Sequence, residues 1–371
     1  MAAIITPRFR KNNAAAFLTD LTTAPSDYYI GLGRSEAWPT EALPPTPTGS
    51  PKELIEAKTA LIQMKKIRSS IDGAGGLNSL SRMIPRVDWS SGRTFKVYSI
   101  SDITSIYSST SGTTITYPSY CINANKLYLC TAKGNGAGAA FTAPTHNTGS
   151  VANTSAGGDL YTWEYLMTLS SSTLNLQNFI AVSDAGIIEK LPSWYVGIAV
   201  DLYSNDLFID TKYRQVSVVK FNNELTAPTD VNVVSAKHFV MNSAITPAVG
   251  SIITQTVAAY QNQATAQPRG IVVAVDGTKV YFSQTPAADG TVTAFTPGTG
   301  STGISINGAA LSTYSSIGVA YTNTVPDPDV VFGEHTKTVR VPNGDIVFLE
   351  NRPSITHASG QVEEVRVVIQ F

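Results

Sequence analysis

The chain is poor in charge. Of its 371 residues, 14% are Asp, Glu, Lys or Arg, against roughly 25% in an average soluble domain. The formal net charge is -1, which excludes the broad basic surface of a general nucleic-acid-binding protein. Disorder usually combines low hydrophobicity with high net charge, whereas 43% of this chain is hydrophobic. We therefore expect a folded protein with no nucleic-acid partner.

The sequence also has few cysteines and no long apolar run. Its two cysteines, Cys121 and Cys130, cannot form a disulfide-rich scaffold. We expect buried thiols, although a disulfide between strands remains an alternative. No stretch of about 20 continuous apolar residues could cross a membrane, and the first residues lack the pattern of a signal peptide. We expect folding in a cytoplasm and no membrane partner.

Residues with catalytic or metal-binding spacing are also missing. The four histidines are scattered, and neither HExxH, GxSxG nor a phosphate-binding loop occurs. We predict that the chain is not an enzyme and has no cofactor, metal or small-molecule substrate. A polysaccharide depolymerase would need convergent carboxylates, and residues 235–325 contain only Asp276 and Asp289.

Two helices are predicted near the N-terminus. Thr6 suits an N-cap and Pro7 a first helical position, which predicts a helix over 7–22. Ser50-Pro51-Lys52-Glu53 is typical of a capping box. Leu54, Ala57, Leu61 and Met64 would form one face of this second helix, with Lys65, Lys66 and Arg68 at its end.

Most of the remaining sequence predicts strands. The segments DYYIGLG (27–33), KLYLCTA (126–132), YRQVSVVKF (213–221) and EVRVVIQF (364–371) are mostly rich in β-branched and aromatic residues. Residues 235–325 carry only five charges and contain Asp276-Gly277, a hairpin signal. We predict a mainly β, multilayered sandwich with two helix-bearing loops near the N-terminus. Residues 235–325 would form an inserted all-β module between body segments 1–234 and 326–371.

Four short motifs combine charged and aromatic residues in contexts typical of turns. They are GRSEAWP (33–39), IPRVDW (84–89), TWEYL (162–166) and LENRP (349–353). Arg and Trp are favoured anchors of interfaces, but they could equally fasten the chain's own fold. The predicted interface or structural residues are Arg34, Trp38, Pro85, Arg86, Asp88, Trp89, Trp163, Glu164, Tyr165, Glu350, Asn351, Arg352 and Pro353.

Two of these motifs carry a specific expectation. Arg86 and Asp88 should fix the loop that follows the second helix, with Trp89 as its apolar anchor. Arg352 should hold a C-terminal hairpin in register.

These motifs, in this order, resemble the baseplate wedge protein encoded by gene eight in T-even-type contractile-tailed bacteriophages. The resemblance starts with ITPRFRKNNAAAFL and continues through IGLGRSEAWP, MIPRVDW, KLYLCTA, GGDLYTWEYLMTL and YRQVSVV. It ends with IVFLENRPSITHASGQVEEVRVVIQF and covers roughly residues 1–225 and 330–371. It implies a three-layered β-sandwich with helix-bearing loops on opposite sides.

The resemblance also implies a function. The family protein is a homodimer that contacts neighbouring wedge proteins, helps to build the baseplate and moves with it on host attachment. The expected location is the virion tail baseplate, after assembly in the host bacterial cytoplasm. Residues 235–325 replace a shorter connection in that family, so their role is not implied.

The alternative function is a receptor- or glycan-binding virion protein that acts through this module. Ser, Thr, Asn and exposed aromatic residues suit contact with a glycan. However, all four tryptophans lie outside the module. Alternating strands would place most of its Phe and Tyr side chains in a core.

Overall fold

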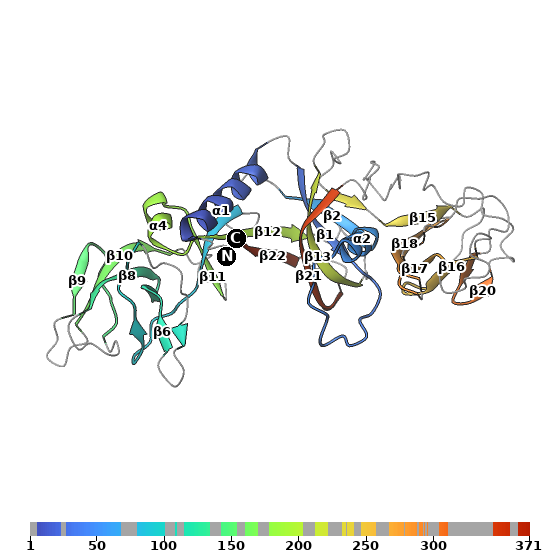
Figure 1. The fold of residues 1–371 in the computed structure, drawn as a ribbon. Coiled ribbons are helices and arrows are strands. Elements are labelled where there is room, and N and C mark those ends of the chain that lie inside the picture. The colour runs from blue at the N-terminus through green and yellow to red at the C-terminus, as the bar shows by residue number, and fades with distance from the viewer. Residues whose placement is uncertain are drawn as a thin grey trace, which may run out of the picture. The chain divides into compact units, whose positions relative to one another are not determined.

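The fold is mainly β, as predicted, and is of the sandwich type (Figure 1). The computed structural model describes residues 6–23, 27–67, 80–100, 108–109, 115–133, 142–153, 160–169, 178–202, 212–221, 232–234, 236–240, 246–256, 267–277, 279–287, 289–291, 293, 295, 304–310, 344–356 and 363–371. The chain divides into two compact units. Unit 1 is Met1–Asp20, Ser69–Ala199 and Arg366–Phe371, and unit 2 is Leu21–Arg68 and Val200–Val365.

Unit 2 contains a five-stranded antiparallel sheet. Its strands, in spatial order, are β14 (Asn232–Val234), β2 (Leu61–Lys66), β1 (Asp27–Gly33), β13 (Lys212–Phe221) and β21 (Gly344–Thr356). The predicted strands 27–33 and 213–221 are therefore confirmed, and they pair with each other from Asp27↔Phe221 to Gly33↔Gln215. The side chains of Tyr29 and Phe221 pack together in one core cluster of this sheet, with their rings edge to face and the ring centroids 5.5 Å apart.

The second helix begins where predicted and ends earlier. In α2 (Pro51–Thr59), Ser50 Oγ accepts a hydrogen bond from the Glu53 backbone N–H. The prediction that the helix continues through Leu61 and Met64 is wrong, because residues 61–66 form β2 and pair with β1. The carbonyl of Ala60 accepts the Arg34 backbone N–H at 2.9 Å instead of a helical donor. Tertiary pairing thus overrides the helical periodicity.

A second sheet of unit 2 lies wholly within residues 235–325. Its order is β15 (Lys237–Val240), β18 (Lys279–Thr285), β17 (Arg269–Asp276), β16 (Ile252–Gln255), β19 (Ile304–Ile306) and β20 (Ala309–Ala310) (Figure 1). The predicted hairpin joins β17 to β18 through Asp276↔Lys279, and Gly277 has the positive φ of 57° that glycine tolerates. Phe282 and Phe295 anchor a core of this sheet.

Unit 1 contains a four-stranded antiparallel sheet and a small mixed sheet. The first has the order β7 (Tyr120–Asn123), β8 (Lys126–Lys133), β10 (Tyr161–Thr168) and β9 (Ser150–Ala152). The second has the order β4 (Thr94–Phe95), β6 (Ile115–Tyr117) and β5 (Ser108–Ser109), with β4 and β6 parallel. Strand β8 confirms the prediction for residues 126–132.

Another four-stranded sheet has the order β11 (Phe179–Val182), β3 (Leu80–Pro85), β12 (Tyr195–Leu202) and β22 (Glu363–Gln370). The division between the two units falls within β12 and β22. In β22, Val365 and Val367 are buried while Arg366 is exposed, as the alternating pattern predicts. Strand β22 confirms the strand predicted at 364–371.

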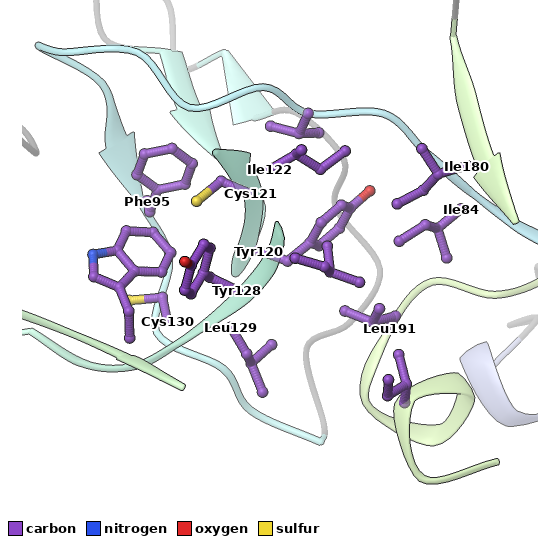
Figure 2. Close-up of a cluster of buried hydrophobic side chains, with 14 of the residues drawn as sticks. Ile84, Phe95, Tyr120, Cys121, Ile122, Tyr128, Leu129, Cys130, Ile180 and Leu191 are labelled. Atoms are coloured by element: carbon purple, nitrogen blue, oxygen red, sulfur yellow. The ribbon is translucent and has the colours of Figure 1, made fainter. Parts of the chain in front are cut away.

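The main core of unit 1 lies between strands of two sheets. Figure 2 shows Tyr120 between Ile84, Ile180 and Leu191 on one side and the group around Phe95 and Tyr128 on the other. The Tyr120 hydroxyl donates to the carbonyl of Pro85 at 2.7 Å, so this polar atom is satisfied inside the core. Two sheets that share one core form the sandwich of this unit.

Two further helices belong to or begin in unit 1. Helix α1 (Pro7–Thr22) has the predicted bounds, and Thr6 Oγ1 accepts the Phe9 N–H as its N-cap. The short helix α4 (Ala185–Lys190) was not predicted; Asp184 caps its N-terminus. Lys11 of α1 is 6% exposed and donates to the carbonyl of Glu189 at the end of α4. A cation at the negative end of a helix dipole is favourable.

Candidate interaction site in unit 2

Arg34 occupies the first position after strand β1 and has an unusual backbone conformation. Its φ is 56°, in the left-handed region that few residues other than glycine adopt. Its guanidinium carbon lies 3.8 Å from the ring centroid of Trp38, so the cation stacks on the indole. Trp38 is only 7% exposed. The first predicted motif is thus a compact, internally stacked turn.

The structure joins this motif to LENRP, more than 300 residues later. The indole Nε1–H of Trp38 donates to the carbonyl of Arg352 at 2.8 Å. Asn351 accepts from Gln215 Nε2 at 2.8 Å and donates to the carbonyl of Pro45, also at 2.8 Å. Strands β13 and β21 therefore hold both ends of the irregular segment 34–49, which we call the 34–49 loop.

Charged groups add a second set of contacts to the 34–49 loop. Arg214 of β13 is 7% exposed and donates to Glu41 Oε1 at 2.6 Å and to the carbonyl of Ser35 at 2.5 Å. Glu41 Oε2 also accepts the Ser354 backbone N–H at 3.2 Å. Desolvation opposes ionisation of Glu41, but the hydrogen bond and charge of Arg214 outweigh it and lower the pKa of this carboxyl.

A pocket of about 280 Å³ opens beside the stacked pair. Its lining comes from the 34–49 loop, from α2 and the residues that flank it, from β13 and β21, and from the end of β18 and the residue after it. The charged lining residues are Arg34, Glu36, Lys52, Glu53 and Glu56. The other lining residues are Trp38, Pro45, Ser50, Ala57, Ala60, Gln215, Thr285, Pro286 and Asn351.

Most of the charges in the pocket wall are already paired. Glu36 binds Arg269, the first residue of β17, and Glu56 lies 3.7 Å from Lys52. Glu53 Oε2 accepts the backbone N–H groups of Thr48 and Gly49 at 2.7 and 2.8 Å. Arg34 differs, since its Nε is buried and has no hydrogen-bond partner among the described residues. Burial lowers the pKa of Arg34, and Glu36 and Glu56 offset this effect only in part.

The LENRP residues lie in a strand, not in a turn. Glu350, Asn351, Arg352 and Pro353 all belong to β21, and Arg352 Nε lies 3.8 Å from Glu350 Oε1 on the same strand. The predicted C-terminal hairpin is wrong, because β21 pairs with β13 whereas β22 belongs to the sheet of β12. Because β21 and β22 are adjacent in the sequence, we expected them to pair with each other. Each of them instead pairs with a strand that is distant in the sequence.

The IPRVDW motif lies in unit 1, at the end of β3 and in the segment after it. Pro85 ends β3, and Arg86 Nε donates to both carboxylate oxygens of Asp88, at 3.1 and 2.9 Å. The Trp89 backbone N–H donates to the carbonyl of Ile122 at 2.7 Å, and its side chain packs on the unit 1 core. The expected pairing is present, although the segment follows β3 and not the second helix.

The TWEYL motif is a strand that faces the core of unit 1. Trp163 of β10 is 1% exposed and packs edge to face on Phe95, with ring centroids 5.1 Å apart. Glu164 forms a 2.7 Å ion pair with Lys190 of α4. Tyr165 packs against Tyr128, with ring centroids 6.1 Å apart. These three residues have contacts within the chain, and an interface role for them stays a prediction.

Sequence reasoning missed four of the charged residues that organise the site in unit 2. Glu36 and Glu41 lie in or beside a motif already chosen for its Arg and Trp, and Arg214 stands in a predicted strand. Arg269 is one of only five charges in residues 235–325. The available signal was the presence of a charged residue, Arg269, in a segment with very few charges. Its partner, Glu36, is 233 residues away in the sequence.

The two cysteines and several aromatic side chains of the module are buried in the protein core. Cys121 and Cys130 are buried free thiols, so the alternative of a disulfide is not found. Within the module, Tyr281, Phe282 and Phe295 are buried as expected, with exposures of 0%, 0% and 2%.

In the described part of the chain, no three His, Cys, Asp or Glu residues gather as a metal site. None of the described helices combines the length and apolarity needed to span a membrane.

Comparisons with known proteins add no relative. No protein-family model matches the chain, and no curated protein matches it.

Proposed function

We propose that the chain is a structural component of a contractile phage tail baseplate wedge. It would scaffold the wedge as a homodimer in contact with neighbouring wedge proteins and move with the baseplate on host attachment. The proposal starts from the ordered set of motifs that resemble the gene eight wedge family. Its location would be the virion, after assembly in the host cytoplasm.

One observation carries the proposal furthest: the GRSEAWP and LENRP motifs, far apart in the sequence, meet in the fold. Trp38 of GRSEAWP donates to the carbonyl of Arg352 in LENRP at 2.8 Å. Motifs that are far apart in sequence but joined in the fold act as one structural unit. This supports reading these two motifs as one structural feature and not as separate chance likenesses.

The 34–49 loop suits a role in protein contact. Hydrogen bonds from β13 and β21 fix its backbone, so little conformational entropy would be lost on binding a partner. Leu43, near its centre, is 78% exposed and is the most exposed of the large hydrophobic residues described. A rigid loop that presents an apolar side chain is a good candidate for the centre of an interface.

The test is co-expression with the products of neighbouring genes, followed by native mass spectrometry. We expect a dimer of the isolated chain and heteromeric complexes on co-expression. Leu43→Glu should weaken at least one of these complexes without lowering the melting temperature, because the side chain is exposed. Val249→Glu is the matched control, since Val249 is 50% exposed in the module, to which the resemblance assigns no contact. A monomer that joins no tail protein would refute the proposal.

A further inference from the structure

The pocket beside Arg34 has the features of a ligand site that the wedge function does not require. A cation that is partly withdrawn from water and has no hydrogen-bonding anion is unfavourable, since it loses hydration without compensation. Arg34 is partly buried, its Nε has no hydrogen-bond partner among the described residues, and Glu36 and Glu56 offset the effect of burial on its pKa only in part. The structure therefore holds a donor group that lacks an acceptor.

The backbone at Arg34 shows that this placement is maintained against a cost. A residue with a Cβ at φ 56° is strained, because its Cβ lies too close to the following carbonyl oxygen. The conformation is fixed by the Arg34 N–H bond to the Ala60 carbonyl at 2.9 Å and by stacking on Trp38. Strain of this kind gathers at ligand sites, where the surrounding structure holds a group ready for binding.

The shape of the pocket allows an occupant. Its volume of about 280 Å³ is far above the ~15 Å³ that one water needs. The indole of Trp38 covers one face of the guanidinium and Nε is buried, so a ligand would approach the terminal nitrogens, Nη1 and Nη2. A planar guanidinium edge matches the two oxygens of a carboxylate.

The charges around the pocket disfavour a doubly charged anion. Arg34 and Lys52 are opposed by Glu36, Glu53 and Glu56, with Arg269 bound to Glu36. The lining itself holds two cations and three carboxylates, and they cancel only when Arg269, outside the lining, is counted with its partner Glu36. A doubly charged phosphate would be repelled by the glutamates more strongly than a carboxylate would be.

We propose that the pocket bounded by Arg34, Trp38 and the start of α2 binds a carboxylate group. Arg34 is the anchoring residue and Trp38 its positioning residue. The carboxylate comes either from a small organic acid or from an Asp or Glu side chain of another polypeptide. This assignment does not depend on the wedge function.

The experiment follows the indole N–H signals of the full-length protein by nuclear magnetic resonance, with Trp38 assigned by its loss in Trp38→Phe. Acetate, succinate and the peptide acetyl-Ala-Glu-Ala-amide are titrated at constant ionic strength. We expect a saturable shift of the Trp38 signal. Chloride, acetamide and acetyl-Ala-Gln-Ala-amide should give none. Tighter binding of the Glu peptide than of succinate would indicate a polypeptide source, and the reverse order a free acid.

Variants separate the site from general effects of charge. Arg34→Gln should abolish the saturable shift, and Arg34→Lys should weaken it at least tenfold, since lysine lacks the planar edge. Arg34→Asn is a second neutral variant that tolerates the left-handed conformation, should the Gln variant fold poorly. Arg8→Gln removes an exposed arginine of α1 and should leave binding unchanged. An equal response to chloride or acetamide, no response in the wild type, or a shift retained in Arg34→Asn would overturn the proposal.

Discussion

At the scale of single residues, burial decides which side chains can react. Cys121 and Cys130 are both 0% exposed on neighbouring strands of unit 1. Burial is the main cause that raises the pKa of both thiols, in Cys130 to about 12. A thiol reacts as its thiolate, so almost none of the reactive form exists near neutral pH.

We predict that neither cysteine is alkylated in the native protein. Iodoacetamide at pH 8 should leave the intact mass unchanged over hours, because the thiols are both protonated and inaccessible. The same treatment in guanidinium chloride should add two carbamidomethyl groups. Rapid labelling before unfolding would show that this core opens locally.

Glu41 gives a pH dependence with a defined sign. Its pKa is lowered in the folded state, so the folded protein binds fewer protons than the unfolded chain between the two pKa values. The contribution of Glu41 to stability is thus fully present above the ordinary pKa of glutamate, about 4.3. It is lost as the pH falls through the lowered value.

We therefore predict that Glu41→Gln lowers stability at pH 7 and makes no difference at the acid end. The effect at pH 7 should be small, under about 1 kcal/mol, because this carboxylate is more than a third exposed. Urea unfolding of both proteins from pH 7 down to pH 3 measures the difference. A difference that stayed constant over this range would mean that the ion pair with Arg214 is not its source.

At the scale of elements, α2 and β2 show local and long-range signals in competition. The capping box predicts the start of α2 correctly, because Ser50 and Glu53 interact within a single turn. Its end depends on strand β1, which captures the Ala60 carbonyl and pairs with residues 61–66. A periodic apolar pattern could not reveal that partner.

We predict that Ser50→Ala destabilises unit 2 by about 1 kcal/mol, the usual cost of a lost N-cap. The serine hydroxyl accepts the Glu53 N–H at 3.3 Å, a long bond, so a smaller loss is compatible with its geometry. Ser50→Asp should retain most of the stability, since Asp also caps helices. Chemical unfolding measures both variants, and equal stability of Ser50→Ala and wild type would show that the cap contributes nothing.

At the scale of the whole molecule, the division into two units governs how the chain should unfold. The unit 1 core includes Tyr120, Trp163 and Ile180. Unit 2 has separate clusters, one around Tyr29 and Phe221 and one around Phe282. Units with their own cores can unfold in separate steps.

We predict two calorimetric transitions. Arg82→Met should lower only one of them, because Arg82 of unit 1 is 8% exposed and its Nε donates to the Ser193 carbonyl at 2.7 Å. Loss of this buried charged donor should cost about 2 kcal/mol. Ser50→Ala should lower the other transition. A single transition shifted by both variants would show that the units unfold together.

The sequence by itself determined the local features of this protein. The mainly β class, the bounds of α1, the start of α2 and the β17–β18 hairpin follow from caps, turns and alternation that act over a few residues. Several motif residues were also found this way, including Arg34, Trp38, Arg86 and Asp88. Physical interactions between near neighbours leave their pattern directly in the sequence.

Only the tertiary structure decided which distant segments meet. It placed Trp38 against the carbonyl of Arg352, Glu36 against Arg269, and β21 beside β13 and not in a hairpin with β22. It also left Arg34 Nε buried without an acceptor at the wall of a pocket. These outcomes depend on how sheets pair and pack across hundreds of residues, and neither composition nor local periodicity encodes the choice of partner.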